Sequence, residues 1–213
     1  MTVESGGPAP VLSLETVDAL TRLPNREGLI ARLDDEIARS ERYRRPLSLL
    51  LADVDGFAVF EGGHGSVAAD TLLQRLSLLL LSAARDADVV ARVGPGEFAL
   101  LLPDADAADA RAAAERLCAE VAAIDLGLIS SKEQDAAVAP FVVAASCSSP
   151  IRMRVGLTTL GPGRPGAGAA LIDQAGAALR KARAERKPVC AFGEEGIDPS
   201  GAAVSSVSPG TAT

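Results

Sequence analysis

The stretch 91–103, which reads ARVGPGEFALLLP, constrains the fold of this chain more than any other part of the sequence. A Gly-Pro-Gly-Glu turn joins two apolar runs, with Val89, Val90 and Val93 before it and residues 98–102 after it. Short runs of such residues around a glycine-containing turn are typical of a β-hairpin. The hairpin carries an acid, Glu97, at its tip. The turn is therefore either a catalytic element or one that has lost its chemistry.

The rest of the chain predicts one α+β domain, with helices packed on a mostly antiparallel sheet. Leu29, Ile30, Leu33 and Ile37 recur at helical spacing behind Asn25, which fits an N-cap. The run 46–55 is apolar and ends in acids, as a buried strand would if it carried Asp53 and Asp55 to its edge. The other predicted strands are 88–93, 97–102, 151–160 and 188–192, and the other predicted helices are 66–85, 104–124 and 169–187.

Segments rich in small and polar residues flank this domain. They predict a disordered arm over 1–16, a folded domain over 17–192 and a disordered tail over 193–213. Residues 125–150 are irregular, and their role stays open between a flap and an edge hairpin.

Composition excludes several classes of protein. Of the 213 residues 48% are hydrophobic and only 3% aromatic, so the core must consist of Leu, Val, Ile and Ala. The net charge of −7 argues against a nucleic-acid or membrane surface. No apolar run approaches the roughly 18 residues of a membrane span, and the N-terminus lacks the layout of a signal peptide. Three unevenly spaced cysteines fit a reduced, cytoplasmic protein.

Four segments, in order, resemble the motifs of the GGDEF family, the diguanylate cyclase domains that join two GTP molecules into cyclic di-GMP. Residues 18–29 resemble an opening D-x-L-T-G-L-P-N-R, with Arg22 in place of Gly, and 49–57 resemble a D-[ILV]-D-x-F strand. Residues 92–103 lie where R-x-G-G-[DE]-E-F belongs, and 178–187 resemble a terminal A-L-Y-x-A-K-x-x-G-R. The resemblance covers about 17–192 and implies a nucleotidyl-cyclase, palm-like α+β fold with a ferredoxin-like core.

The resemblance also implies a metal site, which this sequence has partly lost. Two Mg²⁺ ions would be held by Asp53, by the backbone carbonyl of Val54 and by the third residue of the turn motif. That third residue is Gly96, which has no carboxylate. Pro95 replaces the glycine before it, and proline fixes φ and lacks an N–H donor. Glu97 remains as a relict catalytic acid. Because successive side chains of a strand point to opposite faces of a sheet, Glu97 should point to the face opposite to that of residue 96.

Other positions of the family's nucleotide site are preserved unevenly. The guanine contacts fall on Glu61, in place of an Asn, and on Asp70, which is retained. Gly94 is the first motif glycine, and the phosphate-binding cations fall on Arg183 and Lys187, with Lys and Arg exchanged in order.

The R-x-x-D product-inhibition site of the family is better preserved. Arg85 and Asp88 stand five residues before Gly94, and Arg116 on the next helix could complete a site for cyclic di-GMP. The alternative interpretation is an exposed ion pair between Arg85 and Asp88.

Three hypotheses follow. The first is a catalytically inactive GGDEF domain that binds cyclic di-GMP or GTP and signals to a protein partner, with Mg²⁺ needed only if a nucleotide enters the relict active site. The second is a weak diguanylate cyclase that uses Asp53 and Glu97 and needs a homodimer or another protein to bring two GTP-loaded domains together. The third is an interaction module that binds no nucleotide.

Overall fold

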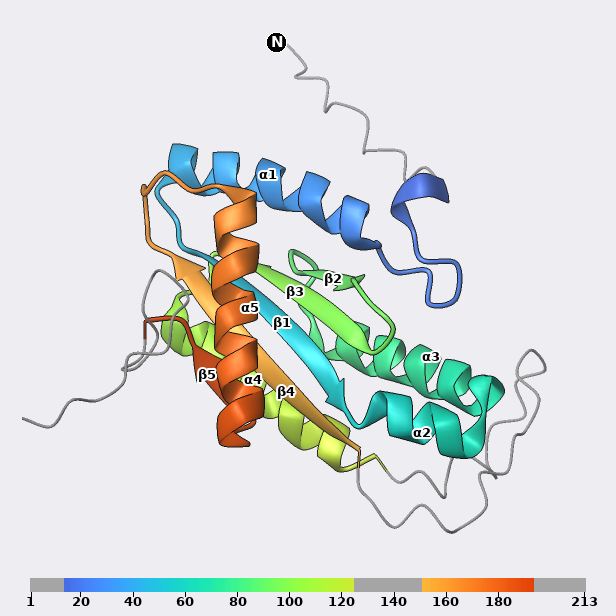
Figure 1. The fold of residues 1–213 in the computed structure, drawn as a ribbon. Helices are drawn as coiled ribbons and strands as arrows, with labels where there is room; N and C mark the ends of the chain where they lie inside the picture. Colours follow the sequence, from blue (N-terminus) through green and yellow to red (C-terminus); the bar gives the residue numbers. More distant parts are fainter. Residues whose placement is uncertain (1–13, 125–150, 194–213) are drawn as a thin grey trace, which may run out of the picture.

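The computed structural model describes residues 14–124 and 151–193 (Figure 1). The predicted arm up to residue 13, the predicted tail from residue 194 and the segment 125–150 lie outside the described residues. Residues 14–16, which the sequence assigned to the arm, form a short 3-10 helix, η1 (Leu14–Thr16). The backbone N–H of Asn25 donates to the carbonyl of Thr16 over 3.0 Å, so this segment is hydrogen-bonded to the domain.

The hairpin predicted from the turn at 94–97 is the edge of a five-stranded sheet in the order β2-β3-β1-β4-β5. Neighbouring strands run antiparallel, except that β4 and β5 are parallel. The sheet is therefore mostly antiparallel, as predicted. The strands are β1 (Leu47–Asp55), β2 (Val89–Arg92), β3 (Glu97–Pro103), β4 (Arg152–Leu160) and β5 (Val189–Ala191).

Helices cover both faces of the sheet (Figure 1). Alternate residues of β1 pack into different clusters: Leu49 contacts the α1 and α5 side, and Leu50 contacts the α2, α3 and α4 side. By the same alternation, Asp53 faces the side of α1 and α5. The helices are α1 (Arg26–Tyr43), α2 (Phe57–His64), α3 (Ser66–Ala83), α4 (Ala107–Ala122) and α5 (Gly168–Glu185).

Local signals explain where several helices begin. The Asn25 side chain accepts from Gly28 N–H over 3.0 Å and caps α1 as predicted. Asp106 caps α4 by accepting from two backbone N–H groups. Ile30, expected on the buried face of α1, is instead 39% exposed.

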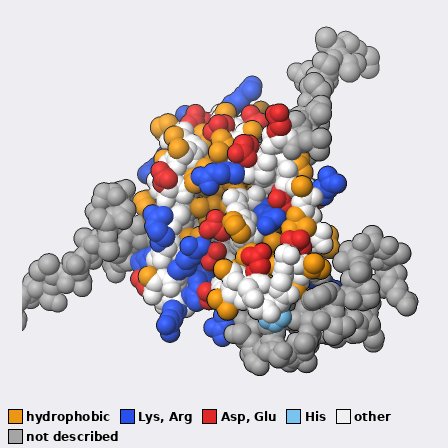
Figure 2. Space-filling view, turned by 45° about the vertical axis from the view of Figure 1, so that its right-hand side comes forward, with side chains coloured by type: hydrophobic (Ala, Val, Ile, Leu, Met, Phe, Trp, Pro, Cys, Tyr) orange, Lys and Arg blue, Asp and Glu red, His pale blue; other side chains and the backbone are white. Residues whose placement is uncertain are grey.

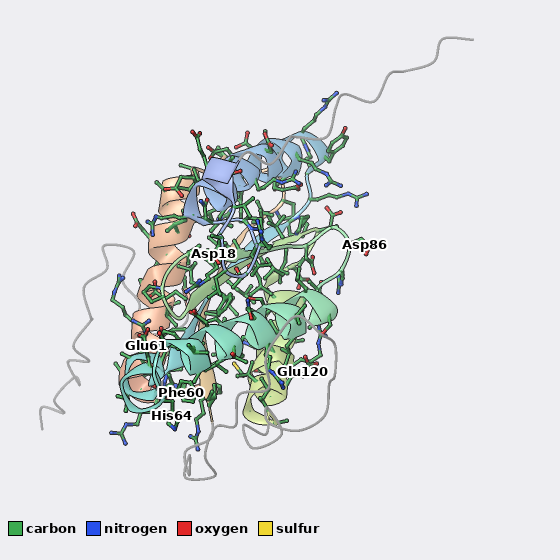
Figure 3. The ribbon with its side chains drawn as sticks, turned by 90° about the vertical axis from the view of Figure 1, so that its right-hand side faces the viewer. Asp18, Phe60, Glu61, His64, Asp86 and Glu120 are labelled. Carbon is green, nitrogen blue, oxygen red and sulfur yellow. The ribbon has the colours of Figure 1, made fainter. Side chains whose placement is uncertain are left out.

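The short helix α2 was not predicted, because the glycines after Glu61 indicate a loop. His64, which the sequence placed in a loop, ends this helix and stacks on Phe60 with ring centroids 4.6 Å apart (Figure 3). Phe57 and Phe60 are buried, so tertiary packing stabilises α2 against its weak helix propensity.

Helix α3 is, among the described residues, long and apolar enough to cross a membrane by length and composition alone. Its Leu72, Leu73, Leu76 and Leu80 are at most 1% exposed and pack in the core against the sheet. Core helices of globular proteins commonly have this length and composition, and the packing is the one expected from the sequence.

Gly156 of β4 lets α5 lie directly on the sheet. A Cβ at this position would collide with the backbone of α5 at Leu179 N and Ala175 O. This contact sets the distance between α5 and the sheet. It thereby positions Arg183, which lies near the C-terminal end of α5, over the end of β1.

Candidate functional site: a hairpin filled by an arginine

Asp53 and Glu97 are cross-strand partners at the hairpin end of β1 and β3. Arg183 of α5 lies between their carboxylates. Its Nε is 3.1 Å from Asp53 Oδ2, and its Nη2 is 2.8 Å from Asp53 Oδ1 and 3.3 Å from Glu97 Oε1. Both acids therefore share one guanidinium, where the resemblance implied a metal ion.

The surroundings of Asp53 disfavour its ionised form relative to a free aspartate. Burial raises the pKa of Asp53 above its ordinary value, and the charges of Glu97 and Asp55 raise it further, so that the attraction of Arg183 does not compensate. Asp55 has its own partner, because Arg154 Nη2 of β4 lies 2.7 Å from its Oδ2. The carboxylates of the relict site are thus held by arginines of the same chain.

The turn itself has a geometry that leaves little room for a side chain at Gly96. A Cβ there would lie 2.9 Å from Cβ and Cγ of Phe57, which is buried. The carbonyl of Gly96 accepts from Val54 N–H over 3.0 Å, which ties the turn to β1. Position 96 therefore points toward α2, whereas Glu97 reaches Arg183 of α5, as strand alternation requires.

Glu97 also occupies the space above Gly94, the first glycine of the motif. A Cβ on Gly94 would lie only 2.6 Å from Glu97 Oε2. The acid of the turn thus bends back over the glycine to which the resemblance assigned a substrate contact.

Arg92 holds the turn from the other side, and sequence reasoning did not single it out. Its Nη2 donates to the carbonyl of Pro95 over 2.9 Å, its Nε donates to the carbonyl of Gly94 over 3.2 Å, and its Nη1 lies 3.1 Å from Asp18 Oδ1. Burial raises the pKa of Asp18, but hydrogen bonds from Thr21 and Arg92 lower it more, so the net shift is downward. Both charged residues belong to the quoted motifs, yet the motifs do not reveal that they pair.

The residues present do not fit a Mg²⁺ site. Among the described residues, no group of three or more His, Cys, Asp or Glu side chains is placed to hold a metal ion. Asp53 is engaged by Arg183, and Gly96 offers no oxygen-bearing side chain. Hard divalent cations require several oxygen ligands in a regular arrangement, and this arrangement is missing here.

The other predicted nucleotide contacts lie on other elements of the fold, and they are exposed. Glu61 is exposed on α2 (Figure 3), and Asp70 is exposed on α3. Lys187 Nζ lies 2.7 Å from Glu185 Oε2 and is 60% exposed. Of the two predicted phosphate-binding cations, only Arg183 is at the hairpin.

The turn between α3 and β2 brings together the three residues of the predicted inhibitory site. Asp88 Oδ2 accepts from the backbone N–H of Arg85 over 2.8 Å, and Arg116 Nη2 of α4 donates to the carbonyl of Ala83 over 3.3 Å. Within the described part of the chain, the Arg85 guanidinium forms no hydrogen bond or ion pair, so the Arg85–Asp88 ion pair of the alternative interpretation is absent there.

This turn is remote from Glu61, the predicted guanine contact on α2 (Figure 3). Figure 3 shows Asp86 of the turn near one side of the molecule and Glu61 near the other. Glu120 of α4, whose Oε1 lies 3.9 Å from Arg116 Nε, marks the helix beside the turn.

The chain belongs to the GGDEF family: the family model for the diguanylate cyclase GGDEF domain matches residues 15–188. The fold is the one that the motifs implied. The GGDEF domain of DgcB from Caulobacter crescentus, solved in complex with c-di-GMP, superimposes with a TM-score of 0.70 over 89% of this chain and 100% of that chain, at 23% identity.

Similarity to particular cyclases is more limited. Diguanylate cyclase DgcP from Pseudomonas aeruginosa is 40% identical over 106 residues, which are 50% of this chain and 16% of that protein. The active GGEEF domain of a diguanylate cyclase from Vibrio cholerae is 25% identical, with a TM-score of 0.65, over 80% of this chain and 98% of that one. The chain thus spans a small part of DgcP, and its GPGEF turn differs from that GGEEF motif.

Proposed function

We propose that this GGDEF domain does not synthesise cyclic di-GMP and instead binds it, as a cytoplasmic receptor that signals to a protein partner. The contact of Arg183 with both Asp53 and Glu97 carries the first half of the proposal. A guanidinium cannot activate a hydroxyl as a metal ion does, because it offers no coordination site. Gly96 and Pro95 support the same conclusion, since one lacks a carboxylate and the other lacks an N–H donor.

The second half depends on the turn between α3 and β2. Arg85 is exposed, and an unpaired guanidinium can bind a phosphate, or the O6 and N7 edge of a guanine, through two parallel hydrogen bonds. Asp88 already accepts a backbone N–H with one oxygen, and its other oxygen can accept from guanine N1 or N2. Arg116 approaches the same turn from α4 and adds a second cation.

The similar DgcB domain was solved with c-di-GMP, which supports this choice of ligand. Cyclic di-GMP carries two phosphates and two guanines, the groups that two arginines and an aspartate recognise. Binding at this turn needs neither Mg²⁺ nor the hairpin. GTP in the relict active site is the competing ligand.

Calorimetric titration of the full chain with cyclic di-GMP tests the proposal. We expect micromolar binding by the wild type, about 10- to 100-fold weaker binding by Arg85→Ala, and unchanged binding by Arg32→Ala. Arg32 is an exposed arginine on α1 and serves as the matched control. Wild-type protein that binds no cyclic di-GMP, or an Arg85→Ala variant that binds as tightly as wild type, would contradict the receptor function.

An assay for cyclic di-GMP formation from GTP and Mg²⁺ tests the loss of catalysis separately. We expect no product. Product that disappears on Asp53→Ala would establish the weak cyclase instead. Stabilisation of the fold by GTP without turnover would move the ligand to the relict site.

A further inference from the structure

A pocket of about 230 Å³ lies on the face that α1 and α5 share. Its apolar wall includes Leu51, Val93 and Ile172, which are only partly buried although they pack against the core cluster of this face. Glu97 and Arg183 form one end, and the pocket extends from there toward Arg26 at the start of α1. Glu61 and Asp70 are not among its lining residues, so it is not the guanine site implied by the family motifs.

Gly176 lines the pocket from α5. This glycine lies inside α5, where glycine is unfavourable for helix stability. A Cβ at Gly176 would meet only Arg180 Nη1 at 3.5 Å and Leu51 Cδ1 at 4.0 Å, which are ordinary contact distances. A larger side chain at this position would therefore extend into the pocket.

The mouth of the pocket is basic. Arg26, Arg180 and Arg183 line it, and in Figure 2 basic and apolar side chains lie next to each other on this face. Arg183 is engaged by Asp53 and Glu97, but Arg26 and Arg180 form no ion pair with any described residue. Arg26 is also the first residue of α1, where a cation opposes the helix dipole unless an anion lies nearby.

These features define the chemistry of a ligand. The partly buried Leu51, Val93 and Ile172 favour an apolar body, while Arg26 and Arg180 favour a phosphate or carboxylate head. A closed cavity of about 150 Å³ holds benzene, so a pocket of about 230 Å³ fits one ring or a short alkyl chain with such a head.

We propose that this pocket binds a small organic anion, with its apolar body against Leu51 and Ile172 and its charged head between Arg26 and Arg180. The pocket is separate from the proposed cyclic di-GMP site, because Arg85 and Asp88 are not among the residues that line it. In the terminal family motif, Arg180 stands in place of a tyrosine, so the basic mouth is partly specific to this chain.

Phenyl phosphate is a suitable probe, followed by ¹H–¹⁵N NMR of the full chain. We expect shifts of the amides around Gly176 and Leu51, with a dissociation constant of about 1 mM for so small a ligand. Inorganic phosphate, which has only the head, and benzyl alcohol, which has only the body, should each bind about tenfold more weakly. Equal binding of either fragment, or no binding of phenyl phosphate, would overturn the proposal.

Two variants locate the site. Gly176→Leu should fill the pocket and weaken phenyl phosphate binding by about tenfold or more, and Arg180→Gln should weaken it by about threefold to tenfold. Ala184→Leu, at an exposed position of α5, is the matched control and should bind like wild type. Unchanged binding by both pocket variants would overturn the proposal. Cyclic di-GMP titration of Gly176→Leu should be normal, so this site and the receptor function can fail separately.

Discussion

A turn adjoins each end of β2, and arginines and acids lie at both turns. They form ion pairs at one turn and leave an arginine unpaired at the other, among the described residues. After β2, the hairpin turn brings Glu97 beside Asp53, and Arg183 binds both carboxylates. Before β2, Asp88 accepts the backbone N–H of its own turn, and the guanidinium of Arg85 has no partner in the described part of the chain. The acids at the first turn are paired with a cation of the chain itself, whereas the Arg85 guanidinium at the second turn stays available for the ligand of the proposed function.

On the proposed function, this difference separates a catalytic site that is lost from a neighbouring ligand site that persists. A metal site requires several oxygen ligands around one point, and the substitution at Gly96 leaves too few. The acids that remain are stabilised by a cation of the chain itself. The turn around Arg85 has no such requirement, because a guanidinium recognises phosphate or guanine without a metal.

The largest effect should come from Gly156→Ala, which displaces the helix that carries Arg183. Its new Cβ would collide with the backbone of α5, and we expect the free energy of unfolding to fall by about 3 kcal/mol in urea denaturation. Gly62→Ala is the control, because its Cβ would meet nothing within 4 Å. A loss below about 1 kcal/mol would show that α5 adjusts easily and does not fix the hairpin end.

Replacing the helix cations beside the two turns, Arg183 of α5 and Arg116 of α4, should have unequal effects on stability. Arg183→Gln leaves Asp53 and Glu97 facing each other, and we expect a loss of about 1 kcal/mol, limited by the partial exposure of the pair. Arg116→Gln should change stability by less than about 0.5 kcal/mol, because its ion pair with Glu120 is exposed. Equal losses, measured by urea denaturation, would remove the contrast between the turns.

Arg22→Gly should stabilise the loop that supports the hairpin through Asp18. Arg22 adopts a left-handed conformation with φ of 62°, which costs an ordinary residue about 1 kcal/mol but suits glycine. Glycine also has more conformational entropy in the unfolded chain, which offsets part of this stabilisation. We therefore expect the free energy of unfolding to rise by only about 0.5 kcal/mol, and the melting temperature to rise by about 1–2 °C. A lower melting temperature would indicate that the exposed Arg22 side chain makes a contribution of its own.

The smallest effect should be a difference in pH dependence between Asp18 and Asp53. The pKa of Asp18 is lowered in the fold, so ionised Asp18 stabilises the folded state. This stabilisation is present above the ordinary pKa of 3.8 and is lost as the pH falls below that value. The pKa of Asp53 is raised, so ionised Asp53 destabilises the folded state; this cost is absent below pH 3.8 and appears as the pH rises through the raised pKa. Urea denaturation across the acid range should show that Asp18→Asn removes the first dependence and Asp53→Asn the second.

Much of the fold could be predicted from local patterns. Helix α1 begins at its Asn25 cap, and the apolar runs gave the strands, because cap chemistry and side-chain periodicity act over a few residues. The hairpin followed from its glycine turn. Helix α2 escaped prediction, since its stability comes from the buried Phe57 and Phe60 rather than from the propensity of its glycines.

The sequence by itself determined that the third motif position has no carboxylate, because Gly96 has no side chain to supply one. It also placed Pro95 in the turn and kept Arg85 and Asp88 together. Only the tertiary structure decided that Arg183 pairs with Asp53, since the two residues are 130 positions apart along the chain. Pairing across strands and helices depends on register and packing, which local patterns do not encode. The same holds for the pocket at Gly176, which exists only where α1 and α5 meet the sheet.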